Sequence, residues 1–165
     1  MKNKSLNMLI VAMLLLATLS VTLIIFLADA KGDFSEDIRV NADGESETIL
    51  AVRDLRLNPT ESRRYDVNLR CAASGSYLMT LDYEEKTNGG MKPFVDVTVL
   101  LNDAVAYEGK LSELLDQDIQ VEFLGELQEG EPTVISVIYK MPREIGNEAQ
   151  ATFAEFDIKL KIKKA

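Results

Sequence analysis

Apolar and polar residues alternate with a period of two through most of the chain after Asp37, which predicts β-strands with one buried face. The last segment shows the pattern most clearly, with inward Ala154, Phe156, Ile158, Leu160 and Ile162 and outward Glu155, Asp157, Lys159, Lys161 and Lys163. The same alternation predicts strands at 65–71, 77–83, 95–101, 119–123 and 135–141. Segments at 38–42 and 49–57 add one or two more. In the second, Arg53 interrupts an apolar face made of Ile49, Ala51, Leu55 and Leu57, which predicts a β-bulge.

Turn-forming pairs separate these segments, among them Asn58-Pro59, Ser74-Gly75, Asn102-Asp103 and Gly146-Asn147. Residues 113–116 are the one helical candidate, a single turn with Ser112 available as its N-cap. Many short strands without βαβ spacing predict an all-β fold over residues 38–165, an antiparallel β-sandwich of jelly-roll or immunoglobulin-like type. If the lysines at 159–164 lie on an edge strand, they discourage further strand pairing.

The N-terminus follows another pattern, because Leu6–Ala28 is an apolar run without a charged residue. As a helix that rises about 1.5 Å per residue, this run is long enough to cross a hydrocarbon core of roughly 30 Å. Lys2 and Lys4 precede it, which predicts a cytoplasmic N-terminus with the rest of the chain outside. We therefore expect a membrane anchor at 1–30, a linker at 31–37 and an extracellular domain at 38–165.

A cleavable signal peptide is the alternative, because Ala28-Asp29-Ala30 fits the A-x-A cleavage pattern. The apolar run exceeds the roughly 7–15 residues of a usual signal core, which favours a retained single-pass anchor. We expect the protein to stay in the cell membrane through Leu6–Ala28, whereas cleavage after Ala30 would secrete it. Both interpretations place the C-terminal domain outside the cell.

Composition narrows the chemistry. The chain has 18 Lys and Arg against 27 Asp and Glu, a net charge of -9, and an acidic surface repels nucleic acid. It has no histidine, which excludes histidine-dependent nucleophilic catalysis and histidine-ligated zinc. Cys71 is the single cysteine, so no disulfide forms within the chain, and its place at the end of an alternating strand predicts a buried core residue.

Two acidic patterns are candidates for a calcium site or for catalysis. The segment 41–47 alternates oxygen ligands, but its glycine falls at the fourth position and Val52 stands where an EF-hand needs a bidentate glutamate. Glu84-Glu85 and Glu144 with Glu148 are carboxylate pairs, the groups that glycosidases use, although neighbours in a strand point to opposite faces. No motif supports either pair, so we expect no catalytic residue, no metal ligand and no cofactor.

The most distinctive string is Tyr139 to Gln150, which includes the pattern M-P-x-x-x-G-N-E-A-Q and is followed by F-x-I-x-L at Phe156 to Leu160. This string resembles the C-terminal part of the camelysin/TasA-type family of exported Gram-positive bacterial proteins. Leu57 to Ser62 is similar to that family's strand lead-in, with Thr60 where glycine is usual. The resemblance spans Ile49 to Ile162. It implies a jelly-roll-like sandwich, export and, in some members, assembly into biofilm matrix fibres, whereas the metalloprotease label of some relatives is not transferred because histidine is absent.

The sequence thus favours a protein that is not an enzyme, a structural or adhesive β-sandwich module at the cell surface or in the extracellular matrix. A carboxylate-dependent hydrolase and an envelope ligand-binding protein are the alternatives; a cavity with convergent carboxylates would indicate the first, and one without them the second. The expected partners are the membrane and a second copy or another cell-surface protein, and not nucleic acid. Self-association would use strand addition, with Asp37–Ala42 donated unless it pairs within its own domain.

Overall fold

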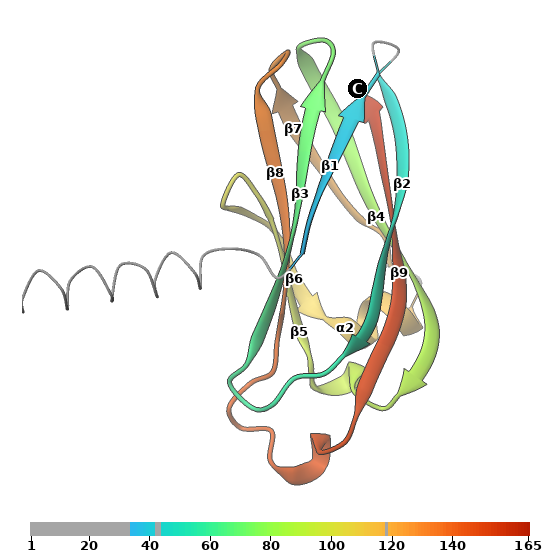
Figure 1. Cartoon of the computed structure of the whole chain (residues 1–165), viewed down its shortest axis with the longest axis vertical. Coiled ribbons are helices and arrows are strands. Elements are labelled where there is room, and N and C mark those ends of the chain that lie inside the picture. The colour runs from blue at the N-terminus through green and yellow to red at the C-terminus, as the bar shows by residue number, and fades with distance from the viewer. Residues whose placement is uncertain (1–33, 42–43, 118) are drawn as a thin grey trace, which may run out of the picture. The chain divides into compact units, whose positions relative to one another are not determined.

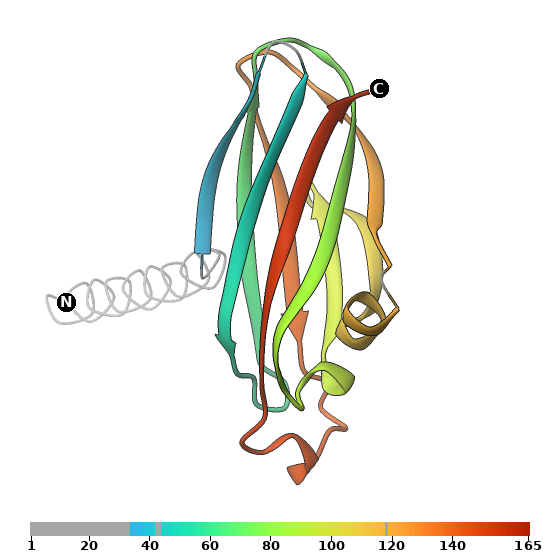
Figure 2. The ribbon, with the colours of Figure 1, turned by 90° about the vertical axis from the view of Figure 1, so that its right-hand side faces the viewer.

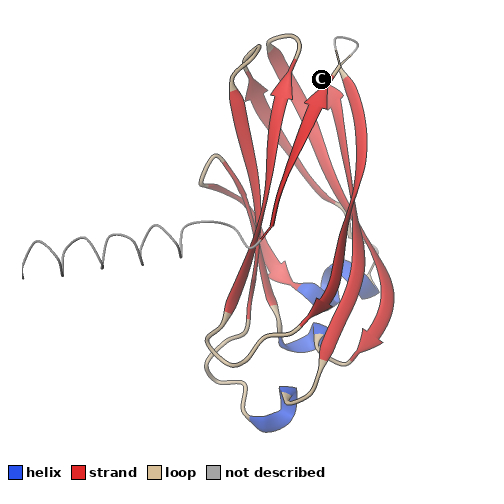
Figure 3. Cartoon of the chain, in the orientation of Figure 1, coloured by secondary structure: helices blue, strands red, loops and turns tan. Residues whose placement is uncertain are grey.

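The computed structural model describes residues 34–41, 44–117 and 119–165, which form a sandwich of two β-sheets (Figure 1). The first sheet has the order β1 (Phe34–Val40), β3 (Ser62–Cys71), β8 (Pro132–Lys140), β5 (Asp96–Leu101) and β6 (Ala104–Lys110). The second has the order β2 (Glu45–Leu55), β9 (Phe153–Lys164), β4 (Gly75–Gly89) and β7 (Val121–Leu127), with β2, β9 and β4 facing the viewer in Figure 2. Short helical turns are confined to the connections, as Figure 3 shows.

The strands β2 to β9 pair in a nested order. The first pairs with the last, the second with the next to last, and so inward to the β5–β6 hairpin, and all four of these pairs are antiparallel. This nesting is the topology of an eight-stranded jelly roll. β1 extends the first sheet as an additional edge strand, parallel to β3. The predicted antiparallel β-sandwich is therefore confirmed, and its strand order is that of the jelly roll.

The core lies between the two sheets and consists of the inward residues that the alternation predicts. It includes Val67, Leu69 and Cys71 of β3, Tyr77, Met79, Leu81 and Tyr83 of β4, Ile135, Val137 and Tyr139 of β8, and Ala154, Phe156, Ile158, Leu160 and Ile162 of β9. Burying a large apolar side chain stabilises a fold by roughly 1.5–3 kcal/mol, so this layer is the main source of stability. The buried position predicted for Cys71 is confirmed, with 5% of the residue exposed.

Aromatic rings fill the centre of this core. The ring centroid of Tyr139 lies 5.6 Å from that of Tyr65 and 5.4 Å from that of Phe156, both edge to face. The buried hydroxyls of Tyr83 and Tyr139 are close enough to influence each other's pKa, but neither meets hydrogen-bond geometry with a described group. Burial is the main reason that the pKa of each phenol is raised, so both stay neutral at physiological pH.

The bulge predicted at Arg53 is confirmed. The register of β2 against β9 shifts between Val52 and Leu55, and Asp54 has a φ of 52°. The apolar face expected at Ile49 and Ala51 is wrong, because both are exposed and Leu50 and Val52 are buried instead. The predicted role of the C-terminal lysines is corrected, because β9 lies between β2 and β4 and is not an edge strand. These lysines face acidic residues across the sheet: Lys161 pairs with Glu47 of β2, and Lys159 with Asp82 of β4. The cross-strand attraction explains how a central strand tolerates them.

Several element boundaries differ from the prediction. β1 begins at Phe34, so residues 34–37, expected as linker, belong to a strand. β6 has no clear alternation in its sequence and was missed, and β7 begins at Val121, so Ile119 precedes the strand. The helical turn α2 (Leu111–Asp116) starts one residue before Ser112, and Lys110 is its N-cap. The Glu113 carboxylate accepts a hydrogen bond from the Lys110 N–H at 3.1 Å, which takes the role predicted for Ser112.

The segment proposed as a donated strand pairs within its own domain. Ile38 and Val40 of β1 lie opposite Leu69 and Cys71 of β3, and both are buried in the core. Intramolecular pairing has the higher effective concentration, which explains this outcome. Ala42, at the end of that segment, lies outside the described residues.

The apolar run Leu6–Ala28 and the cleavage pattern at Ala30 lie outside the described residues. Within 34–41, 44–117 and 119–165, no helix has both the length and the apolar character needed to span a bilayer. The anchor and its orientation therefore stay predictions from the sequence.

Candidate functional site

The β2–β3 and β8–β9 loops meet at one end of the sandwich, at the bottom of Figure 1. These loops hold most of the segments 57–62 and 139–150, which the sequence pattern singles out. The Thr60 N–H donates a hydrogen bond to the Met141 carbonyl at 3.0 Å, and the Met141 N–H donates one to the Glu61 carbonyl at 3.0 Å. Two segments far apart in the sequence thus form one joined surface, which the sequence pattern alone did not reveal.

The β2–β3 loop contains a tight turn from Asn58 to Glu61, closed by a hydrogen bond from the Glu61 N–H to the Asn58 carbonyl at 2.9 Å. Pro59 takes the second position, and Thr60 takes the third with a φ of 75°, as in a type II turn. Glycine is usual there because a β-branched residue resists a left-handed φ. Thr60 therefore adopts the backbone conformation of the expected glycine, at a steric cost.

A side chain also ties this turn. The Glu61 carboxylate accepts a hydrogen bond from the Asn58 N–H at 2.8 Å. This bond to the Asn58 backbone is the main reason that the pKa of Glu61 is lowered. The ionised carboxylate thereby holds the turn that presents Asn58 and Pro59 to the surface.

The β8–β9 loop is ordered by its own hydrogen bonds around the helical turn η2 (Asn147–Ala149). The Gln150 side-chain amide donates to the Asn147 side-chain oxygen at 2.9 Å, and the Gln150 N–H donates to the Asn147 carbonyl at 3.1 Å. The Thr152 hydroxyl donates to the Ala149 carbonyl at 2.7 Å, and Ala151 between them has a φ of 61°. Local polar side chains, rather than core burial, hold most of this loop in place.

A pocket of about 520 Å³ lies between these two loops. Its lining residues are Arg56, Leu57, Asn58, Pro59, Gly146, Asn147, Ala149, Gln150, Ala151 and Thr152. We call it the loop-end pocket. Arg56 carries the only charge among these lining residues. The other polar groups of the loop-end pocket are side-chain amides, a hydroxyl and backbone groups. Such a surface can donate and accept hydrogen bonds but offers no carboxylate for acid–base chemistry.

Two contacts hold Arg56, which lines this pocket. Its guanidinium lies 5.2 Å from the centroid of the Phe153 ring, and its Nε lies 2.7 Å from a carboxylate oxygen of Asp54. Both charged side chains are more than half exposed, so the ion pair contributes little to stability. The pair and the ring instead fix the orientation of the guanidinium.

The structure does not gather the candidate carboxylates at this pocket. Glu84 binds Lys86 at 2.6 Å and Glu85 binds Lys92 at 2.9 Å. This agrees with the prediction that neighbours in a strand point to opposite faces. Glu144 and Glu148 are exposed in the β8–β9 loop, and neither lines the loop-end pocket.

The other candidates also have structural roles. The Gly44 N–H donates to the Asn41 carbonyl at 2.9 Å, which closes the turn at 41–44. The Cys71 thiol donates to the Gln128 carbonyl at 3.1 Å. Among the residues that the structure describes, no three acidic or cysteine side chains are placed to hold a metal ion.

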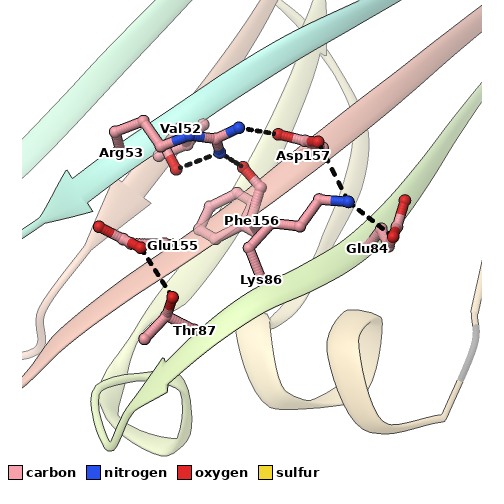
Figure 4. Close-up of polar contacts among 8 residues, drawn as sticks. All are labelled: Val52, Arg53, Glu84, Lys86, Thr87, Glu155, Phe156 and Asp157. Carbon is pink, nitrogen blue, oxygen red and sulfur yellow. Dashed lines mark hydrogen bonds and ion pairs between the residues drawn. The ribbon is translucent and has the colours of Figure 1, made fainter.

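A charged network covers the outer face of the second sheet (Figure 4). Arg53 reaches from β2 to Asp157 of β9 at 2.6 Å, and Lys86 of β4 lies 2.6 Å from Glu84 and 3.4 Å from Asp157. The hydrogen bond from Arg53 is the main reason that the pKa of Asp157 is lowered, and the hydrogen bond to Glu84 is the main reason that the pKa of Lys86 is raised. These shifts favour the charged forms, as in a structural ion-pair network, and supply no proton donor or acceptor near neutral pH.

No family model and no curated protein matches the chain. Among solved structures, the chain resembles a β-glucosidase from Paenibacillus barengoltzii, with 11% identity, a TM-score of 0.39 and coverage of 77% of this chain and 11% of that one. It also resembles the pre-peptidase C-terminal domain of a Bacillus anthracis collagenase, with 9% identity, a TM-score of 0.37 and coverage of 78% and 94%. For the EclA C-terminal domain, a sugar-binding protein, identity is 15%, the TM-score 0.42 and coverage 72% and 79%. Likeness at this level carries no functional conclusion.

Proposed function

We propose that this protein is a noncatalytic structural or adhesive β-sandwich module outside the cell, held at the membrane by Leu6–Ala28 or secreted after cleavage at Ala30. One observation carries the proposal: among the described residues, three of the four large apolar side chains left exposed lie on edge strands of the sheets, each on a different edge. Ile49 of β2, Val105 of β6 and Leu124 of β7 are 57%, 61% and 66% exposed, whereas the fourth, Ile119, precedes β7 and is 36% exposed. Edge strands with such side chains are the positions at which a sandwich accepts another chain. The resemblance to camelysin/TasA-type proteins supports the same role.

The noncatalytic part of the proposal rests on how the carboxylates are placed. Carboxylate hydrolysis needs two acids that face one cleft. The loop-end pocket has no acid among its described lining residues. Asp82, Glu84 and Asp157 do line a smaller pocket of about 170 Å³ on the outer face of the second sheet, but there Lys86 binds both Glu84 and Asp157, and Arg53 binds Asp157. Glu85 is bound by Lys92.

The test of this part is a hydrolysis assay on the purified full-length protein, with casein and a bacterial glycan as substrates. We expect no product above the level of a buffer control. Hydrolysis that disappears in both Glu144→Gln and Glu148→Gln would contradict the proposal and support a carboxylate-dependent hydrolase.

The location is tested separately, by the N-terminal residue and the membrane partitioning of the protein recovered from cells. We expect a membrane-bound form that retains the Leu6–Ala28 segment. Cells in suspension that carry the full-length protein should also aggregate more than cells without it. Recovery of a soluble form that begins at Lys31 as the main species would replace the anchored form by the secreted one.

A ligand-binding role is the second candidate, and the loop-end pocket favours it. Asn58, Asn147 and Gln150 present both donors and acceptors beside the guanidinium of Arg56, which suits a neutral polyhydroxylated or weakly anionic ligand. A glycan array would distinguish the two roles, with Asn147→Ala as the variant and Glu144→Gln, outside the pocket, as its control. Binding lost only in Asn147→Ala would favour the ligand binder.

A further inference from the structure

The edge strand β2 has backbone groups that are open to another strand. The Lys164 N–H donates to the Gly44 carbonyl at 2.9 Å, which continues the antiparallel register of β2 with β9. In such a ladder, alternate residues direct both backbone groups to the partner. Ser46, Thr48 and Leu50 therefore face β9, and Glu45, Glu47, Ile49 and Ala51 direct their N–H and C=O groups to the free edge.

Between Glu45 and Val52 this edge lacks the features that commonly block strand addition. The register of β2 runs without a break over this stretch, its bulge begins only after Val52, and the stretch contains no proline and no lysine. In the edge strand β6, a bulge opposite Val99 and Leu100 interrupts the pairing with β5. At the centre of the unbroken stretch is Ile49, which is 57% exposed.

The outward side chains of β2 are complementary to themselves when two copies run antiparallel. If Ile49 faces Ile49 of a second copy, Glu47 falls opposite Ala51, and Glu45 comes beside Arg53, the residue at which the bulge of β2 begins. The same contacts recur on the other side of the two-fold axis. All of these residues are exposed on the outer face of the sheet. Shifting the axis to Glu47 would instead bring two glutamates face to face, which is unfavourable.

We propose that two copies of this protein associate through their β2 strands, antiparallel about a two-fold axis at Ile49, and join their four-stranded sheets into one continuous sheet. The backbone ladder and the apolar contact at Ile49 hold the two copies together, and the charges select the register. Glu45 lies 3.5 Å from Lys163, and Arg53 lies 2.6 Å from Asp157 of its own sheet. The neighbour's charges therefore extend existing exposed pairs and do not have to be stripped of water.

This inference rests on the proposed structural function and names its partner, a second copy of the chain. The two can fail separately. A hydrolytic activity would overturn the function without bearing on β2, whereas absence of the β2 contact would leave the noncatalytic module with another partner.

The first test is disulfide cross-linking of Ile49→Cys in cells that express the full-length chain. Facing residues of a hydrogen-bonded antiparallel pair have Cα atoms about 5.5 Å apart, within the roughly 4.4–6.8 Å that a disulfide spans. Leu124→Cys is the matched control, since it places an even more exposed thiol on the edge strand β7. The unmodified chain controls for Cys71, which is buried. We expect a cross-linked dimer of Ile49→Cys alone.

The second test is the molecular mass of the full-length chain in detergent, measured by light scattering across a dilution series. Ile49→Lys places two like charges at the axis and should raise the dissociation constant of the dimer at least about tenfold, which corresponds to about 1.4 kcal/mol. Val105→Lys is the control, because it changes an equally exposed residue on another edge, and circular dichroism checks that both variants fold. Cross-linking of Ile49→Cys no stronger than that of Leu124→Cys, or a dimer that persists in Ile49→Lys, would overturn the proposal.

Discussion

The two free edges of the second sheet look alike by exposure and differ in charge. β2 exposes Ile49, and β7 exposes Leu124 even more fully. When β2 faces a copy of itself about Ile49, acidic Glu45 meets basic Arg53. When β7 does so about Leu124, Glu122 meets Glu126 on both sides of the axis.

The comparison shows that an exposed apolar residue does not by itself make an interface between copies. Like charges directly opposite across two strands are destabilising, and opposite charges are favourable by up to about 1 kcal/mol each. The β7 edge therefore carries its own protection against self-pairing, a common device of natural edge strands. The β2 edge lacks this protection and is the one that a second copy can occupy.

The largest effect is expected from Glu45→Lys, which turns both attractive pairs of the β2 contact into repulsive ones. We expect the dissociation constant to rise roughly 10- to 100-fold, since two pairs change by about 1 kcal/mol or somewhat more each. Exposed ion pairs and exposed like-charge contacts both weaken as the salt concentration rises, so added salt should weaken the original dimer and strengthen that of the variant.

Glu122→Lys is the matched control for this experiment, because it makes the same charge change on β7 and leaves β2 intact. Analytical ultracentrifugation of the full-length chain at two salt concentrations measures both variants. Equal losses in the two would show that net charge, and not the β2 register, governs association.

A smaller gain is expected from Glu126→Lys, which makes β7 self-complementary around Leu124. The lysine would face Glu122 of the second copy at both ends of the contact. The variant loses a hydrogen bond from the Ser76 hydroxyl to Glu126. We therefore expect only weak association through β7, with an association constant about tenfold above that of the original chain at this edge. The measurement is disulfide cross-linking of Leu124→Cys combined with Glu126→Lys. No increase in that cross-link would mean that charge is not what separates the two edges.

Thr60→Gly separates the stability of the fold from the behaviour of its edges. The turn at Thr60 lies at the loop end, away from the stretch Glu45–Val52, and its φ of 75° is strained for a β-branched residue. Relief of this strain should raise the free energy of unfolding by about 1 kcal/mol, measured by urea denaturation, with association unchanged. Thr60→Ala keeps the Cβ atom and should gain less. A loss of stability in Thr60→Gly would show that the threonine side chain contributes more than its strain costs.

The smallest effect is expected from acid titration at Asp157, the residue that holds Arg53 on the β2 edge. Its pKa is lowered from 3.8 in the folded state, chiefly by the hydrogen bond from Arg53. A lowered pKa means that the folded state favours the ionised form, so its stabilising effect is present above pH 3.8 and is lost as the pH falls through the lower folded value. The stability difference between the original chain and Asp157→Asn should shrink over that range, which urea denaturation at several pH values can follow. A stability difference that does not change with pH would exclude the ionised carboxylate of Asp157 as the source of that difference.

The strands were largely predictable because each exposes one face to the core and one to solvent, and this alternation is written locally in the chain. The inward residues of β9 and β4 and the bulge at Arg53 were found in this way. β6 was missed because each of its residues is exposed or half-buried, so neither face of the strand is consistently apolar. The N-cap of α2 was misplaced because Lys110 acts through its backbone N–H, which carries no side-chain signal.

The candidate site was much less predictable. Both loop strings were recognised as distinctive, but the hydrogen bonds between Thr60, Glu61 and Met141 depend on the ends of β2, β3, β8 and β9 meeting. The sequence identified Asn58, Pro59 and Asn147 only as turn-forming residues between strands. Only their common position at one end of the sandwich turned them into the lining of a pocket.

The sequence by itself determined the all-β class, the inward face of most strands, the burial of Cys71 and the charges along each strand, because all of these depend on neighbours in the chain. The tertiary structure decided which strands pair and which remain at an edge, since pairing is a long-range choice made by the packing of the whole core. That choice placed the lysines of β9 in the middle of a sheet and left Ile49 of β2 at its border. Charged side chains therefore stabilise the fold on the central strand β9, and on the edge strand β2 they select the register of a second copy.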